Sequence, residues 1–159
     1  MSLLMYVAGP FADRDKVRVI ADKLREAGHR VSSSWLEINE LPPEGTSREE
    51  YYREQGLKDL HEVITSDMLI YCNTGTISEG KATELGVAIA TLKPTIIIGD
   101  RSNNIFLHLN IPCFPDVDAA IRWMVEQKAA YMASKGITEI VEQAVENHDA
   151  DNTDTGTNS

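Results

Sequence analysis

Strand-like segments alternate with segments of helical spacing along the chain, and this alternation limits the folds that are open to it. The expected strands span residues 3–8, 30–36, 68–72, 95–98 and 111–114, the last of them at an edge. Continuous apolar runs such as residues 68–72 are typical of strands buried on both faces. Because helices separate consecutive strands, the strands are expected to be parallel. The order predicts an α/β fold whose parallel sheet is covered by helices on both faces.

Capping residues indicate where the helices begin and end. The expected helices span residues 13–28, 47–65, 79–92 and 116–147, with an interruption of the last near Gly136. Asp13 is a candidate N-cap and Gly28 a stop for the first helix. Ser47 and Glu50 have the spacing of a capping box at the start of the second expected helix.

The length of 159 residues suits one domain with a substantial hydrophobic core. We predict that this domain spans residues 1–147 and contains no internal repeat. Residues 148–159 contain Ala150 as their only apolar residue. Because such a segment buries almost no apolar surface, it is predicted to be a disordered acidic tail.

The charge of the chain excludes some classes of partner. Twenty-five acidic residues against 15 basic ones give a net charge of −10. A protein that binds a nucleic-acid backbone or an anionic membrane needs a basic surface, so neither partner is expected. A free nucleotide remains possible, since backbone N–H groups at a helix start can hold one phosphate.

The chain carries no sign of export, metal binding or a cofactor. It has no signal-peptide pattern and no apolar run of membrane-spanning length, so we predict a cytoplasmic protein. Cys72 and Cys113 form no CxxC pair, which indicates two free thiols rather than a zinc or redox site. Dinucleotide and Walker motifs are also missing, and we expect neither a metal nor a cofactor.

Ligands of parallel α/β sheets bind beyond the carboxyl ends of the strands. This rule brings residues 9–11, 73–80 and 99–104 around one crevice. Glu84 lies about one turn into the helix that follows the second of these segments. It is either a helix-surface glutamate or a carboxylate aimed into the crevice, where it could attack an anomeric carbon.

Asp59 is the second candidate carboxyl group. It is either a solvated helix aspartate or the partner of Glu84, because glycosidic bonds are commonly cleaved by two carboxyl groups. Asp67 stands just before a strand, where an aspartate more commonly ends a helix, and we leave it out of the site.

Several residues near the crevice are candidates for substrate binding. Gly9, between Tyr6 and Pro10-Phe11, would let a ligand approach the backbone closely. Ser78 and Gly80 open the Glu84 helix, where they either meet an anion or, for Ser78, simply cap the helix. Trp35 is either a core residue or a wall of a base pocket.

Three segments together resemble the nucleoside 2-deoxyribosyltransferase superfamily, over roughly residues 3–115. They are Tyr6-Val7-Ala8-Gly9-Pro10-Phe11, the Asp59 helix with Ser66-Asp67-Met68-Leu69-Ile70, and Gly80-Lys81-Ala82-Thr83-Glu84-Leu85-Gly86. The superfamily includes hydrolases of 2′-deoxynucleoside 5′-monophosphates. The resemblance implies a flavodoxin-like, three-layer sandwich with a five-stranded parallel sheet.

The resemblance also implies roles for individual residues. Glu84 matches the glutamate that forms a covalent deoxyribosyl intermediate, Asp59 the aspartate that handles the proton of the base, and Tyr6 the tyrosine that positions the nucleophile. Asn104 and Phe106 match a segment that a neighbouring subunit contributes to the site. A homo-oligomer with a shared active site and a small-molecule substrate is therefore expected.

One departure from the family pattern concerns the 5′ end of the substrate. Typical transferases carry an aspartate six residues before the nucleophile, and this chain has Ser78 there. The serine is similar to that of the monophosphate hydrolases, with Arg14 and Arg101 as candidate cations. Three interpretations stay open: a deoxyribosyltransferase, a deoxynucleoside-monophosphate N-glycosidase, and a non-catalytic nucleotide-binding module.

Overall fold

A computed structural model of the chain describes residues 2–38, 42–102 and 104–126. Its centre is one sheet of five parallel strands in the order β2-β1-β3-β4-β5. The strands are β1 (Leu4–Ala8), β2 (Arg30–Val31), β3 (Met68–Asn73), β4 (Thr95–Gly99) and β5 (Cys113–Phe114). The predicted α/β class, the parallel sheet and the flavodoxin-like arrangement are confirmed.

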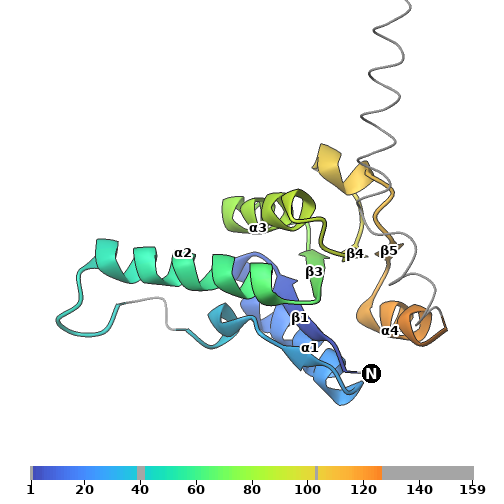
Figure 1. Ribbon diagram of the computed structural model, residues 1–159, viewed down its shortest axis with the longest axis horizontal. Helices are drawn as coiled ribbons and strands as arrows, with labels where there is room; N and C mark the ends of the chain where they lie inside the picture. Colours follow the sequence, from blue (N-terminus) through green and yellow to red (C-terminus); the bar gives the residue numbers. More distant parts are fainter. Residues whose placement is uncertain (1, 39–41, 103, 127–159) are drawn as a thin grey trace, which may run out of the picture.

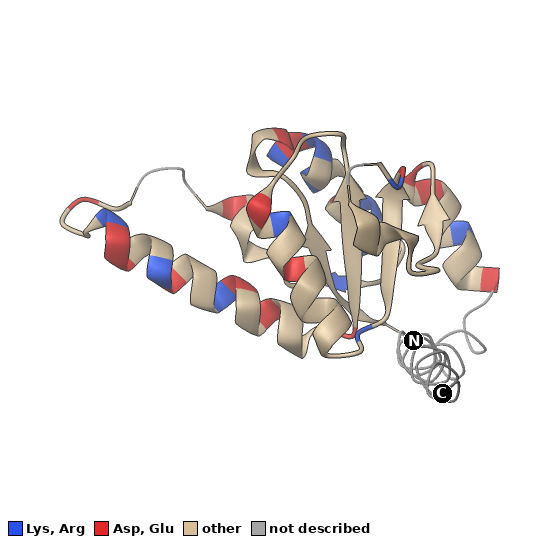
Figure 2. Ribbon diagram, turned by 90° about the horizontal axis from the view of Figure 1, so that it is seen from above, with Lys and Arg blue, Asp and Glu red and all other residues tan. Residues whose placement is uncertain are grey.

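Helices cover both faces of this sheet (Figure 1). They are α1 (Arg14–Glu26), α2 (Arg48–Thr65), α3 (Glu79–Ala90) and α4 (Val117–Glu126), with short 3-10 turns η1 (Phe11–Asp13), η2 (Ser34–Glu37) and η3 (Ile105–His108). Helices α1 and α4 pack together on one face, and α2 and α3 on the other. The first turns of α2 project beyond the sheet, and acidic and basic side chains are interspersed along this helix (Figure 2). Among the described helices, none is long and apolar enough to cross a membrane.

The central strands β1 and β3 form the core that holds the site. Met5, Tyr6, Val7 and Ala8 are completely buried, because helices lie on both sides of β1. Ser47 caps α2 as predicted, since its hydroxyl accepts from the Glu50 N–H at 3.1 Å. Asp13 stands at the N-cap of α1 as expected, but its side chain makes no capping hydrogen bond.

The predicted second strand is wrong beyond Val31. Residues 34–37 form the turn η2 instead, and two side chains replace the missing strand ladder. The Val7 N–H donates to the Ser33 hydroxyl at 2.5 Å, and the Trp35 indole N–H donates to the Val7 carbonyl at 2.9 Å. The predicted final helix is described only as α4, and its continuation and the predicted tail, residues 127–159, lie outside the described residues.

Gly99 ends β4 in a backbone conformation that requires glycine. Its φ is +115°, and a Cβ there would lie 2.2 Å from the Asn73 carbonyl oxygen. Only glycine fits this approach without moving the backbone. Because β3 and β4 are adjacent parallel strands, the segment after β4 lies beside the segment after β3, at the edge of the sheet where the crevice was expected.

Candidate active site

Tyr6, Asp59 and Glu84 come together on the face of the sheet covered by α2 and α3. The Tyr6 hydroxyl donates to Glu84 Oε1 at 2.6 Å. Tyr6 is fully buried on the inner strand β1, so this contact anchors the Glu84 carboxyl group to the core. Asp59 is close enough for its charge to raise the pKa of both Tyr6 and Glu84. The three residues are the centre of a carboxyl cluster.

The inner side of α2 adds polar groups to this cluster. Gln55, Asp59 and Glu62 recur at helical spacing, and Glu62 Oε2 accepts from the Ser34 N–H at 2.9 Å. Three buried oxygens have no hydrogen-bond partner among the described residues, namely Gln55 Oε1, Asp59 Oδ1 and Glu84 Oε2. Since buried polar atoms are nearly always bonded, these oxygens are suited to polar groups of a ligand.

Burial changes the acidity of both carboxyl groups. Burial raises the pKa of Glu84 to about 8, the charges of Asp59 and Glu62 add to the increase, and the hydrogen bond from Tyr6 opposes it. Burial likewise raises the pKa of Asp59 to about 6. The charge of Glu62 adds to this increase, and the charge of Lys58 opposes it. Between these values the pair holds one proton, and this proton lies mainly on Glu84, the group with the higher pKa. Glu84 is ionised beside a protonated Asp59 only after the proton has moved to Asp59.

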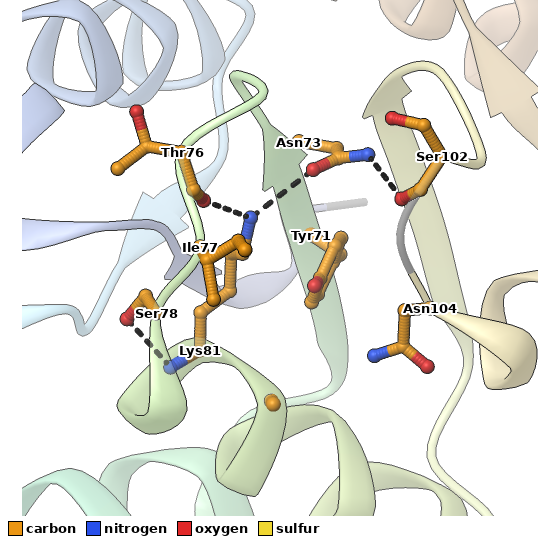
Figure 3. A pocket seen from close by; sticks show the side chains of 9 residues that line it. Tyr71, Asn73, Thr76, Ile77, Ser78, Lys81, Ser102 and Asn104 are labelled. Atoms are coloured by element: carbon orange, nitrogen blue, oxygen red, sulfur yellow. Dashed lines mark hydrogen bonds between the residues drawn. The ribbon is translucent and has the colours of Figure 1, made fainter.

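A second feature, the α3 pocket, lies at the carboxyl ends of β3 and β4 and at the start of α3 (Figure 3). It has about 330 Å³ of space, part of it open to solvent. The described residues that line it are Tyr71, Asn73, Thr76, Ile77, Ser78, Lys81, Ala82, Ser102 and Asn104. Tyr71 links the α3 pocket to the carboxyl cluster, since it lines the pocket and its pKa is raised by burial and by the charge of Glu84.

Two of the predicted binding residues, Ser78 and Asn104, line the α3 pocket. Ser78 is the N-cap of α3 and its hydroxyl accepts from the Lys81 N–H at 3.2 Å, so the capping interpretation holds. Asn104, which the resemblance places in a neighbouring subunit's site, lines the α3 pocket of its own chain and caps η3. Gly80 is exposed in the first turn of α3, and Phe106 is 53% exposed on η3.

The residues after β1 have packing roles. A Cβ on Gly9 would lie 2.6 Å from Val17 Cγ2, so Gly9 lets β1 and α1 approach, and this reason concerns packing rather than a ligand. Pro10 is buried and Phe11 is 37% exposed. Trp35 is buried as a core residue, and its ring lies 6.4 Å from the Phe11 ring.

The cation near the predicted phosphate position is different from the two that the sequence suggested. Arg14 donates to the Ile38 carbonyl at 2.6 Å, and Arg101 donates to the carbonyls of Leu107 and Ile111. Lys81, which sequence reasoning missed, lines the pocket instead. Its position three residues before Glu84 on the same helix was the available signal.

Asp67 stands apart from the site, whereas Cys72 lies on β3 close enough to Lys81 for their charges to interact. Asp67 Oδ2 accepts from the Leu4 N–H at 2.7 Å at the start of β1. Asp67 therefore lies at the amino ends of the strands, whereas the pocket lies at their carboxyl ends. Cys72 is buried, and burial raises the pKa of its thiol to about 12. Within the described ranges, no group of three or more His, Cys, Asp or Glu residues could hold a metal ion.

The model of the family described as "Nucleoside 2-deoxyribosyltransferase" matches residues 5–153, nearly the whole chain. The chain belongs to this family. Family membership supports an enzyme that cleaves an N-glycosidic bond and transfers the sugar. No curated protein matches the sequence significantly.

Solved structures resemble the fold of this nucleoside 2-deoxyribosyltransferase family member at low sequence identity. A conserved protein from Enterococcus faecalis V583 has a TM-score of 0.60 at 16% identity, over 80% of this chain and 99% of its own. The 2-deoxyribosyltransferase of Bacillus psychrosaccharolyticus has a TM-score of 0.56 at 21% identity, over 74% of this chain and 90% of its own. The Clostridium botulinum CMP N-glycosidase has a TM-score of 0.49 at 15% identity, over 77% of this chain and 98% of its own.

The buried Glu84 carboxyl predicts a pH-dependent effect on stability. Because the pKa is higher in the folded protein than in the unfolded chain, Glu84 stabilises the fold at low pH and loses this contribution as the pH rises from about 4.5 to about 8. Glu84→Gln removes the ionisation, so its effect on the Tm should be more favourable at high pH. The change in Tm that the substitution causes should be higher at pH 9 than at pH 5 by about 4 °C or more. Thermal unfolding by circular dichroism measures this, with the exposed Glu79→Gln as a control; equal shifts at both pH values would contradict the burial argument.

Proposed function

We propose that the protein cleaves the N-glycosidic bond of 2′-deoxynucleosides or their 5′-monophosphates, with Glu84 as the nucleophile. The observation that carries this proposal is the hydrogen bond of 2.6 Å from Tyr6 to Glu84 Oε1, beside the carboxyl of Asp59. A nucleophilic carboxylate next to a second carboxyl of different acidity is the arrangement that glycosidic cleavage uses.

In the first step, a carboxylate oxygen of Glu84 attacks C1′ of the deoxyribose. The C1′–N bond breaks, and its electron pair goes to the nitrogen of the base. Asp59 supplies the proton that the departing base takes up, which leaves a deoxyribosyl ester on Glu84. In the second step, the nitrogen of a new base or a water molecule attacks C1′, gives its proton to Asp59, and releases Glu84.

Tyr6 orients the nucleophile in this scheme. Its hydroxyl binds Oε1, while Oε2 has no hydrogen-bond partner among the described residues and is the oxygen suited to attack. Desolvation and the neighbouring carboxyls raise the pKa of the Tyr6 hydroxyl far above its usual value, so Tyr6 remains a neutral donor throughout. A donor that stays protonated holds the carboxylate in one rotamer.

The acceptor of the sugar separates the two catalytic alternatives. A base as acceptor makes the protein a deoxyribosyltransferase, which is our first proposal because the whole chain follows the family pattern. Water as acceptor makes it a deoxynucleoside-monophosphate N-glycosidase, which Ser78 in place of an aspartate favours. A non-catalytic nucleotide-binding module is the third possibility, and it requires no covalent intermediate.

Glu84 is predicted to carry the covalent intermediate. Incubation with a panel of deoxynucleosides and their monophosphates should release base, and intact-mass spectrometry should detect one deoxyribosyl group per chain. Glu84→Ala and Glu84→Gln should abolish both signals, whereas Glu79→Gln, an exposed change on the same helix, should leave them unchanged. Base release by Glu84→Ala above a few per cent of the wild-type rate would exclude this nucleophile.

Asp59 is predicted to handle the proton of the base. Asp59→Asn should lower the cleavage rate of substrates with poor leaving groups by a factor of ~10² to 10⁴. It should lower the cleavage rate of a nitrophenyl deoxyriboside much less. Because one proton is shared between pKa values of about 6 and about 8, kcat/KM should follow a bell-shaped pH profile with limbs there. The variant should lose one limb, and equal slowing of both substrates with an unchanged profile would make Asp59 a structural residue.

We also propose that the protein is a homo-oligomer whose subunits share the site. Leu57, Leu60 and Ile64 lie along one exposed side of α2, and Ile105 and Phe106 are 78% and 53% exposed on η3. Exposed apolar groups of this kind mark contact surfaces. Light scattering during size exclusion should report a dimer or larger, and Leu57→Glu with Phe106→Glu should lower both the mass and the activity. A fully active monomer would contradict the shared site.

A further inference from the structure

Lys81 is a buried cation without a carboxylate partner. Only 3% of the residue is exposed, although it lies in the first turn of α3 beside the pocket. Its Nζ donates to Asn73 Oδ1 at 3.1 Å and to the Thr76 carbonyl at 3.2 Å, and lies 4.9 Å from the centre of the Tyr71 ring. All three partners are neutral, and no ion pair of Lys81 occurs in the described part of the chain.

The two nearest carboxylates are already bonded to other groups. Asp13 accepts from the hydroxyls of Thr74 and Thr76 and from Lys16, at 2.6 to 2.7 Å. Asp100 accepts from the Asn73 amide and from the N–H and hydroxyl of Ser102. Burial lowers the pKa of Lys81, while Asp13 and Asp100 act in the opposite sense from a distance. Their charge helps to keep the ammonium group protonated without pairing directly with it.

The α3 pocket has the electrostatics of an anion site in an otherwise acidic protein. None of its nine lining residues is acidic, whereas the chain as a whole carries a net charge of −10. Beside Lys81 it presents the Ser78 hydroxyl, which accepts one hydrogen bond and can still donate its own proton. The start of the twelve-residue helix α3 adds its N–H groups and the positive end of its dipole. Figure 3 shows these groups around one opening.

We propose that Lys81 binds the 5′-phosphate of the substrate and thereby selects deoxynucleoside monophosphates over deoxynucleosides. Lys81 and Ser78 precede Glu84 by three and six residues, which places them about 4.5 and 9 Å back along the helix axis. In the proposed pose, C1′ of the deoxyribose faces Glu84 and the 5′ end extends toward the α3 pocket, across Tyr71. This inference rests on the proposed function for the position of C1′, but the anion site itself can be tested without turnover.

Binding of fragments to the wild-type protein is the first measurement. Isothermal titration compares deoxyribose 5-phosphate, deoxyribose and inorganic phosphate, none of which contains a glycosidic bond to a base. Deoxyribose 5-phosphate should bind at least tenfold more tightly than either of the others. Equal binding of deoxyribose and its 5-phosphate would overturn the proposal, and equal binding of inorganic phosphate would show an ion site that does not recognise the substrate.

Variants then separate the charge of Lys81 from its contacts to the loop. Lys81→Met should weaken the binding of deoxyribose 5-phosphate at least tenfold. It should also lower kcat/KM for monophosphates, relative to kcat/KM for nucleosides, by a similar factor. Lys81→Arg should restore part of both the binding and the substrate preference. Arg122→Met removes a distant exposed charge on α4 and should change neither. If Lys81→Met slows nucleosides and monophosphates equally, Lys81 only holds the loop and the proposal fails.

The two proposals fail in different ways. Tight binding of deoxyribose 5-phosphate without any base release from the panel contradicts the proposed reaction and leaves the anion site standing. Base release with no preference for monophosphates contradicts the role of Lys81 alone. If Lys81→Met does not fold, the wild-type fragment titration and the Lys81→Arg substrate preference still decide the question.

Discussion

The hydrogen bond from Tyr6 to Glu84 joins the inner strand β1 to α3, and the rest of the candidate site is arranged around it. Tyr6 is fully buried, so its hydroxyl has a fixed position, and the Glu84 carboxyl is held at 2.6 Å from it. Asp59 and Glu62 approach the same point from α2. A carboxyl group in such a place is costly to ionise, which is the physical origin of its raised pKa.

This arrangement exchanges stability for reactivity. Carboxyl groups that repel one another in a desolvated space destabilise the folded protein as they ionise. The same desolvation removes water from a carboxylate and makes it a better nucleophile. The oxygens of Gln55, Asp59 and Glu84 that have no partner among the described residues are further signs that this site is suited to a polar ligand.

The two polar regions of the crevice have opposite character. The carboxyl cluster is acidic, whereas the neighbouring α3 pocket contains Lys81 and no acidic residue. Tyr71 lies between them, with its ring close to the Lys81 ammonium group and its pKa raised in part by Glu84. A ligand with a neutral or basic heterocycle at one end and an anionic group at the other would match both regions at once. The two loops of the pocket lie together because they follow the adjacent parallel strands β3 and β4, whose last paired residues are Asn73 and Gly99.

The sequence by itself determined the parallel α/β fold and the positions of most helices, because these depend on apolar periodicity and capping residues that are local in the chain. The family came from the resemblance of three motif segments. The sequence also singled out Tyr6, Asp59 and Glu84, although the resemblance was needed for their roles. The short second strand depended on contacts of Ser33 and Trp35 with β1, which no local pattern records. Likewise, only the tertiary structure showed that Arg14 and Arg101 are bound to backbone carbonyls and that Lys81 is the cation of the pocket. Partners of this kind lie far apart in sequence, and packing alone decides which donor meets which acceptor.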